Sequence, residues 1–345
     1  MPAITASKSV NDRRAATPTP DALDALLAQL APEMAAVNQV IVANMQSEVQ
    51  LIPQLAAHIV AAGGKRLRPL LTLATARLCG YEAGSRHVNL AACVEFIHTA
   101  TLLHDDVVDE SQLRRGLASA NAVFGNQASV LVGDFLFSRA FQLMTADGSL
   151  TVLKILSDAA ATIAEGEVLQ LVTQNDLTTT EDRYLEVVRG KTAALFAAAC
   201  EVGAVVANRP PSDCEALAEY GRCIGTAFQL VDDALDYAAS QLDLGKTIGD
   251  DFREGKITLP VLLAYHAGSE ADRIFWQRTI EQTEQTDEDL HHAMDLMHQT
   301  LAITGTIARA ALFAEQAKSS LATFPQGALR DGLKAVADYT VSRVR

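Results

Sequence analysis

The sequence predicts an all-α fold in a single domain. Hydrophobic residues make up 49% of the 345 residues and aromatic residues only 5%, with Ala and Leu predominant. This composition is typical of helices rather than of sheets, which favour β-branched and aromatic residues. No stretch alternates apolar and polar residues as a half-buried strand does. A chain of this length can form one domain or two, but no linker or shift in composition divides it.

The first 20 residues are expected to form a disordered tail that precedes a domain over residues 21–345. The tail is polar, contains prolines and lacks the apolar core of a secretory signal. Lys8, Arg13 and Arg14 faintly resemble a transit peptide. The prolines and the poor amphipathicity favour a disordered cytoplasmic segment instead.

From residue 21 onward the pattern predicts one helix after another. The first begins at Asp21, a residue type that caps helices, and Pro32 predicts a break within it. A second stretch runs to Ala62 and ends at Gly63-Gly64. Further helices are expected over residues 66–79, 86–109, 127–145, 150–173, 180–207, 212–239, 256–267, 270–284, 287–303, 305–322 and 327–343.

Charge, hydropathy and cysteine content exclude several classes of protein. The net charge of −14 argues against nucleic acid as a partner. No uninterrupted apolar run reaches the roughly 18 residues of a transmembrane span. The five cysteines lack CxxC pairing and are expected to be inert buried thiols in a reducing compartment. A cytoplasmic location fits these features.

Two aspartate clusters of the same design stand within apolar, helix-patterned stretches, LLHDDVVDE and FQLVDDALDY. Their members are Asp105, Asp106 and Asp109, and Asp232, Asp233 and Asp236. The first and last members of each are four positions apart, so on a helix both carboxylates leave the same face. Such carboxylates repel each other and are costly to desolvate without a positive partner. Mg²⁺ carrying phosphate oxygens supplies one. The clusters therefore predict two walls of one diphosphate-binding cavity.

Basic residues near the start of the chain are candidates to bind the phosphates. In GGKRLRP, two glycines free the backbone and Pro69 suits the first turn of a helix. Lys65 and Arg68 then flank a helix N-terminus, which favours an anion. The alternative is a solvated basic loop. Arg114 and Arg115 follow the first aspartate cluster and can reach two phosphates, or can simply complement a helix end.

Two more lysines occur later in the chain. Lys191 opens the apolar segment KTAALFAAAC, where it is either a ligand or a snorkelling end residue. Lys246 lies in a glycine-containing loop directly after the second aspartate helix. Such a loop is suited to act as a lid that brings Lys246 over the cavity.

The order and spacing of these motifs resemble those of trans-polyprenyl diphosphate synthases. The motifs are GGKRLRP, LLHDDVVDE followed by RRG, GKT, FQLVDDALDY and LGKTIGDDFREGKITLP. The whole run, over roughly residues 25–340, resembles the long-chain bacterial members that make octaprenyl, nonaprenyl or decaprenyl diphosphate. The resemblance implies an isoprenoid-synthase-type helical bundle around a deep central cavity, usually in a homodimer.

The same resemblance implies roles for individual residues. It implies roughly two or three Mg²⁺ ions, with ligands Asp105, Asp109 and Asp232. The other catalytic residues would be Asp106, Asp233, Asp236, Lys191 and Lys246. Isopentenyl diphosphate would be bound by Lys65, Arg68, His98 and Arg115. The allylic diphosphate would face Arg114, Lys191, Thr192, Gln229 and Lys246. His98 lies two helical turns before Asp105 on the same face, although a lone histidine there is more often part of the core.

The implied reaction is Mg²⁺-dependent condensation of an allylic diphosphate, farnesyl or similar, with successive isopentenyl diphosphates. The product would be a long all-trans polyprenyl diphosphate, with ubiquinone side-chain supply as its natural use. The growing chain is expected to pass Thr101, Ala100 and Ile97 towards a floor at Phe137 or Phe141. Small residues at positions 100 and 101 leave that path open, which opposes a short product.

Three alternatives stay open. A farnesyl or geranylgeranyl diphosphate synthase shares every motif and differs only in the expected product length. A class I terpene cyclase also uses an aspartate-rich motif in an α bundle, but its second site normally has an Asn/Ser/Glu pattern. A non-catalytic partner subunit or helical scaffold is expected to lack aspartates or the basic cluster, and both are present here.

Overall fold

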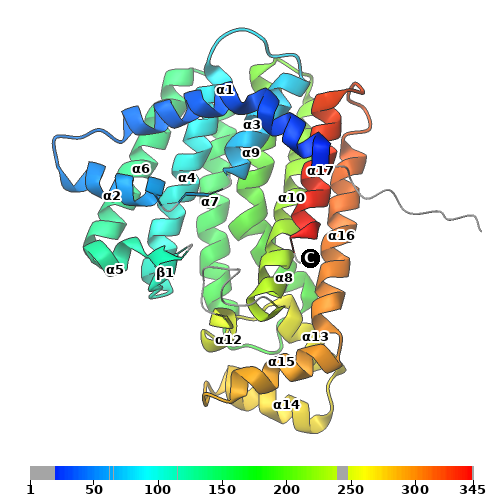
Figure 1. Cartoon of the computed structure of the whole chain (residues 1–345). Coiled ribbons are helices and arrows are strands. Elements are labelled where there is room, and N and C mark those ends of the chain that lie inside the picture. Colours follow the sequence, from blue (N-terminus) through cyan, green and yellow to red (C-terminus); the bar gives the residue numbers. More distant parts are fainter. Residues whose placement is uncertain (1–19, 62, 65, 115, 239–247, 344–345) are drawn as a thin grey trace, which may run out of the picture.

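The computed structural model describes residues 20–61, 63–64, 66–114, 116–238 and 248–343, which form the helical bundle of Figure 1. The helices are α1 (Pro20–Asn44), α2 (Leu51–Ala61), α3 (Leu67–Leu78), α4 (Arg86–Val108), α5 (Ala120–Phe124), α6 (Asn126–Asp147), α7 (Leu150–Thr173), α8 (Glu181–Val188), α9 (Ala194–Val206), α10 (Pro211–Ala238), α12 (Asp250–Arg253), α13 (Leu259–Ala267), α14 (Glu270–Trp276), α15 (Asp289–Gln299), α16 (Ala302–Ser320) and α17 (Ala328–Ser342). The π-helical turns η1 (Arg189–Ala193) and η2 (Gln277–Glu281) continue α8 and α14.

The all-α prediction is confirmed. Among the described residues, extended pairing is limited to β1 (Leu113–Arg114) and β2 (Leu117–Ala118), a two-residue antiparallel ladder in the loop after α4. Most predicted helices match within two or three residues. The sequence did not predict the short helices α5 and α12, which are too brief to show a periodic pattern.

Helix α9 lies at the centre of the bundle and contacts α3, α4, α7 and α10. Small residues let these neighbours come close. A Cβ on Gly221 of α10 would lie 2.3 Å from the carbonyl oxygen of Phe196, so only glycine fits there. In Figure 1, α1 lies across the upper end of the bundle, and α14 and α15 lie at its lower end.

The expected break at Pro32 is wrong, because α1 runs without interruption from Pro20 to Asn44. A proline inside a helix removes one hydrogen bond, here the one to the carbonyl of Ala28. Both Pro32 and Ala28 are exposed, so water can solvate the carbonyl that has lost its partner. The buried side of the helix holds it in place.

Helix α1 is also the one described helix that is long and apolar enough to cross a membrane, over Ala22–Asn44. Its side chains Leu26, Leu30, Val37 and Ile41 are buried in the main core. The helix packs on α3, α4 and α17. In this structure it is therefore part of the bundle.

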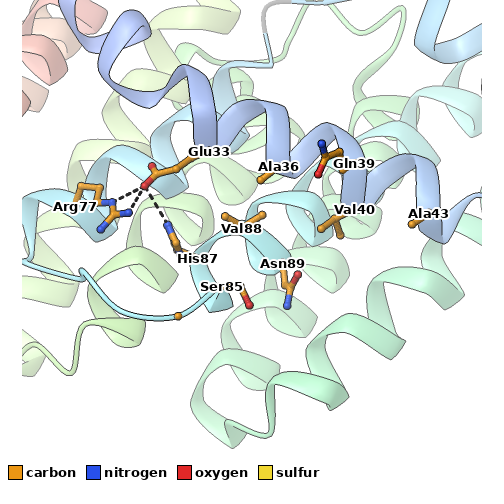
Figure 2. Close-up of a pocket in the computed structure, with 11 residues that line it drawn as sticks. Glu33, Ala36, Gln39, Val40, Ala43, Arg77, Ser85, His87, Val88 and Asn89 are labelled. Atoms are coloured by element: carbon orange, nitrogen blue, oxygen red, sulfur yellow. Dashed lines mark hydrogen bonds and ion pairs between the residues drawn. The ribbon is translucent and has the colours of Figure 1, made fainter.

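A polar cluster ties α1 to α3 and α4 (Figure 2). Glu33 Oε1 accepts a hydrogen bond from Arg77 Nε at 2.6 Å and lies 3.5 Å from His87 Nε2. The His87 side chain is only 2% exposed. Burial lowers the pKa of His87, and the Glu33 carboxylate only partly opposes this effect. His87 is therefore neutral at pH 7.

We expect His87 to make the fold less stable in acid. Because its pKa is lower in the folded chain than the value of about 6.5 in the unfolded chain, protonation favours unfolding once the pH falls below that value. Thermal midpoints measured from pH 7.5 to pH 5 should fall less steeply in His87→Gln than in the wild type. The exposed His291 provides a control, since His291→Gln should leave the slope unchanged. Equal slopes for His87→Gln and the wild type would contradict this assignment.

Candidate active site

A cavity of about 1000 Å³ brings both aspartate clusters together. Helix α4 supplies one wall and α10 the other, while residues of α7, α8, η1 and α9 complete the lining. The carboxylates of both clusters thus face a shared space, although they are far apart in the sequence. The second aspartate cluster therefore lies in the same cavity as the first, as the sequence predicted.

In the first cluster two aspartates line the cavity and the third is turned into the protein. Asp105 and Asp109 line the cavity, one helical turn apart. Asp106 is buried, and its Oδ1 accepts a hydrogen bond from Arg114 Nε at 2.6 Å. The Asp106 backbone carbonyl accepts another from Asn121 at 3.0 Å. Asp106 therefore orients Arg114 and the loop after α4, while its two neighbours remain available to a ligand.

The second cluster divides in the same way. Asp232 lies 3.2 Å from the Arg343 guanidinium, which also stacks over the Phe228 ring at 4.0 Å. Asp233 is buried among internal hydrogen-bond donors. Asp236 Oδ2 accepts from the backbone N–H of Asp251 at 3.1 Å. Asp236 thus fixes the start of α12, while Asp232 lines the cavity beside Arg343.

A π-helical turn places the predicted GKT residues. Between α8 and α9 the chain widens into η1, which carries Lys191 and Thr192. Turns of this kind re-aim side chains and are frequent at functional sites. Helix α7 approaches η1 closely, since a Cβ on Gly166 would lie 2.5 Å from the backbone nitrogen of Lys191. This approach sets Glu167 Oε2 2.7 Å from Lys191 Nζ.

Burial strongly perturbs the charges in the cavity. Burial raises the pKa of Asp105 to about 7, and Lys191 only partly offsets this effect. Burial works to lower the pKa of Lys191, but the carboxylates of Asp105 and Glu167 outweigh it and raise the pKa. Carboxylates and ammonium groups therefore stabilise each other inside the cavity.

Lys256 lines the cavity. The sequence did not predict a role for it, although it lies within the motif LGKTIGDDFREGKITLP. Its Nζ lies 3.1 Å from Asp109 Oδ2 and also pairs with Glu254. Burial opposes the charge of Lys256, yet Asp251, Asp109 and Glu254 together raise its pKa. The one feature of the sequence that could have marked Lys256 was its position just before the segment ITLP, which is buried in the structure. Lys246, which was expected to close the cavity, lies outside the described residues.

Other lining residues were also missed. Glu167 and Gln170 of α7 fall in the stretch IAEGEVLQL, which contains none of the predicted site residues. Arg343 lies at the far end of the chain, where no local pattern marks it. Arg66 also lines the cavity, beside the predicted Arg68.

The predicted isopentenyl diphosphate pocket is described in part. Arg68 lies at the start of α3, with its guanidinium 4.2 Å from the centre of the Phe196 ring. Arg68 and His98 both line the cavity. Lys65 and Arg115 lie outside the described residues. These positions are compatible with the predicted roles, which remain predictions.

The expected tunnel residues divide into three groups. Thr101 lines the cavity, together with Ile163 of α7 and Leu195 of α9. Ala100 and Ile97 are fully buried in the core and are not part of the lining, so their role as tunnel walls stays a prediction.

The two phenylalanines of α6 do not form a floor. Phe137 stacks on the His104 ring, with centroids 6.2 Å apart, and is not part of the lining. Placing Phe141 at the floor is wrong, because α6 turns its side chain to the outer surface, where it is 47% exposed.

The donor set fits Mg²⁺ bound together with phosphate. Among the described residues no three carboxylate, imidazole or thiolate groups form a ready-made metal site. Mg²⁺ does not need one, because it keeps several waters and takes one or two carboxylates plus substrate phosphates. Asp105, Asp109 and Asp232 offer hard oxygen ligands from opposite walls.

Comparison with known proteins agrees with this geometry. Residues 49–297 match the family described as polyprenyl synthetase. The octaprenyl diphosphate synthase of Escherichia coli (strain K12) is 49% identical over 315 residues, which cover 91% of this chain and 97% of that protein.

Solved structures of similar chains share the fold. A polyprenyl synthase from Caulobacter crescentus CB15, complexed with calcium and isoprenyl diphosphate, superposes with a TM-score of 0.91 at 52% identity, covering 93% of this chain and 97% of that one. A decaprenyl diphosphate synthase from Rhodobacter capsulatus gives a TM-score of 0.88 at 53% identity, covering 93% and 99%.

We expect Asp232→Asn to weaken the binding of inorganic diphosphate in the presence of Mg²⁺ by about 10- to 100-fold, because one charged oxygen ligand is lost. Isothermal titration calorimetry measures the affinity. Asp158→Asn is the control, since Asp158 is an exposed residue paired only with Lys154. If both variants bind like the wild type, Asp232 is not a ligand.

Proposed function

The chain belongs to the polyprenyl synthetase family and is a prenyltransferase, and from this premise we propose that it makes a long all-trans polyprenyl diphosphate. It would condense an allylic diphosphate, such as farnesyl diphosphate, with successive isopentenyl diphosphates. One observation carries the proposal. Two aspartate walls and two groups of basic residues, Lys191 with Lys256 and Arg68 with His98, line one cavity. A site for two diphosphates suits condensation rather than hydrolysis.

The chain's own residues would stabilise the leaving diphosphate. Lys191, Lys256 and Arg114 line the cavity and can donate charge-assisted hydrogen bonds to its oxygens. Asp105, Asp109 and Asp232 would hold Mg²⁺, which would supply positive charge to the diphosphate as the C–O bond breaks.

The second substrate would attack the allylic cation thus formed. Arg68 and His98 hold the isopentenyl diphosphate so that its double bond faces the cation. The new bond forms between the two carbons, and a proton leaves the condensed product. The released diphosphate accepts that proton, so the reaction needs no side-chain base.

Relatives and pocket shape both support a long product. The relative from Escherichia coli is named an octaprenyl diphosphate synthase, and one solved structure a decaprenyl diphosphate synthase. Thr101, which lines the cavity, is small. A farnesyl or geranylgeranyl synthase has less support, as do a cyclase and a non-catalytic subunit. A cytoplasmic location and use of the product for ubiquinone are part of the proposal.

The direct test is an assay of the purified protein with farnesyl diphosphate, labelled isopentenyl diphosphate and Mg²⁺. Chromatography of the dephosphorylated products should show chains of octaprenyl to decaprenyl length. No product longer than the starter would refute the proposed function.

We expect Thr101→Phe to shorten the product, because a larger side chain in the lining would take up space in the cavity. Thr101→Val keeps the shape and should leave the length unchanged. Product length is read from the same chromatograms. If Thr101→Phe makes the wild-type product, the chain grows in another direction.

We also propose a homodimer, which would cover an apolar face. Helices α6 and α7, neighbours in contact, carry exposed hydrophobic residues. These are Val130, Leu131, Phe141, Leu150, Val168, Leu171 and Val172. An apolar surface of this kind marks an interaction site, and a two-fold dimer would pair it with its own copy.

Leu131→Glu should convert the dimer to a monomer. Leu131 is 66% exposed on α6, and burying a carboxylate against the apolar partner costs at least about 2 kcal/mol per copy. Light scattering after size-exclusion chromatography gives the mass. Leu312→Glu on α16 makes the same change at 63% exposure and should remain dimeric. A wild-type monomer would refute the dimer itself.

A further inference from the structure

A chain of hydrogen bonds joins four residues in the wall of the cavity, Tyr184, Asp233, Gln229 and Thr192. Tyr184 Oη donates to Asp233 Oδ2 at 2.5 Å. Gln229 Nε2 donates to Asp233 Oδ1 at 2.8 Å. Thr192 Oγ1 donates to Gln229 Oε1 at 2.6 Å. The chain thus joins α8, α10 and η1 through their side chains.

The pattern fixes the orientation of the Gln229 amide. Its nitrogen donates to the Asp233 carboxylate, and its oxygen accepts from the Thr192 hydroxyl. A flipped amide would turn its oxygen towards the carboxylate, which is unfavourable. Both Gln229 and Thr192 line the cavity. The position of Asp233 therefore influences which of their polar atoms face a ligand in the cavity.

Both carboxyl oxygens of Asp233 thereby accept hydrogen bonds from other side chains of the protein. One of its oxygens bonds Tyr184 and the other bonds Gln229, and the residue is only 4% exposed. Its partner Tyr184 is equally buried, and its hydroxyl is the end of the chain farthest from Thr192. Burial raises the pKa of Asp233 to about 7, and the hydrogen bonds from Tyr184 and Gln229 oppose this effect. Tyr184 holds one of the two carboxyl oxygens, so it is a main determinant of where that group lies.

We propose that Tyr184 is a positioning residue for the allylic substrate, acting through Asp233 on Gln229 and Thr192. This inference rests on the proposed function, because it assigns these two cavity residues to the allylic diphosphate. Without the hydroxyl, the Asp233 carboxylate keeps one donor and can turn towards the space left empty. Gln229 follows its hydrogen-bond partner and moves away from Thr192.

The test is Tyr184→Phe, which removes only the hydroxyl and keeps the ring in the core. We expect kcat/KM for the allylic diphosphate to fall about 10- to 100-fold, the loss of one hydrogen bond to a charged group. KM for isopentenyl diphosphate should stay within about 2-fold, since Arg68 and His98 belong to other helices.

Tyr220→Phe is the matched control. Tyr220 is fully buried on the same helix as Asp233, and its hydroxyl donates to the Leu333 carbonyl at 2.7 Å. Removing it should lower the thermal midpoint while leaving both KM values unchanged. If Tyr184→Phe behaves like Tyr220→Phe, the hydroxyl is only structural and the inference is overturned.

Coupling gives a second readout. Tyr184→Phe and Asp233→Asn should be strongly non-additive in allylic kcat/KM, because both act on one hydrogen-bond chain. Additive effects would contradict the inference.

The failure of the proposed function gives a different result. In that case the wild type makes no product, and the affinity for inorganic diphosphate with Mg²⁺ is compared instead. A weaker affinity in Tyr184→Phe than in Tyr220→Phe would then support positioning, and equal affinities would refute it.

Discussion

The cavity depends on charge compensation between groups that are far apart in the sequence. Carboxylates gathered among apolar helices are unstable unless cations lie beside them. Lys191 lies next to Glu167, Lys256 next to Asp109, and the Arg343 guanidinium next to Asp232. The binding of a diphosphate with its metal would exchange these partners, because lysines would turn to phosphate and aspartates to the cation. The fold therefore holds several of its ligand-binding groups in ion pairs, although acidic residues outnumber lysines and arginines in the lining.

Each aspartate cluster combines two tasks. Its second member, Asp106 or Asp233, is buried and bonds neighbouring side chains, although Asp233 also lines the cavity. Asp105, Asp109 and Asp232 line the same cavity. Consecutive positions on a helix point about 100° apart, so adjacent aspartates cannot share a direction. One therefore anchors the wall while the other meets the ligand.

The sequence was sufficient to predict the features that follow from local residue patterns. The helices follow from periodicity, and the position of both aspartate clusters in one cavity follows from their spacing and chemistry. Contacts set by tertiary packing were not predictable. Lys256 meets Asp109 across 147 positions and Arg343 meets Asp232 across 111. Phe141 was misplaced because composition does not tell which face of α6 turns inward.

The π-helical turn has a consequence for how this protein tolerates change. Because η1 accommodates an extra residue within a wider turn, removing one residue there would restore a regular α-helical turn with little rotation of α9. The packing of α9 on its four neighbours would be kept, whereas the aim of Lys191 would be lost. A deletion in the regular part of α9 would instead rotate the residues on one side of it by about 100° relative to the other side and change the packing of the molecule's central helix.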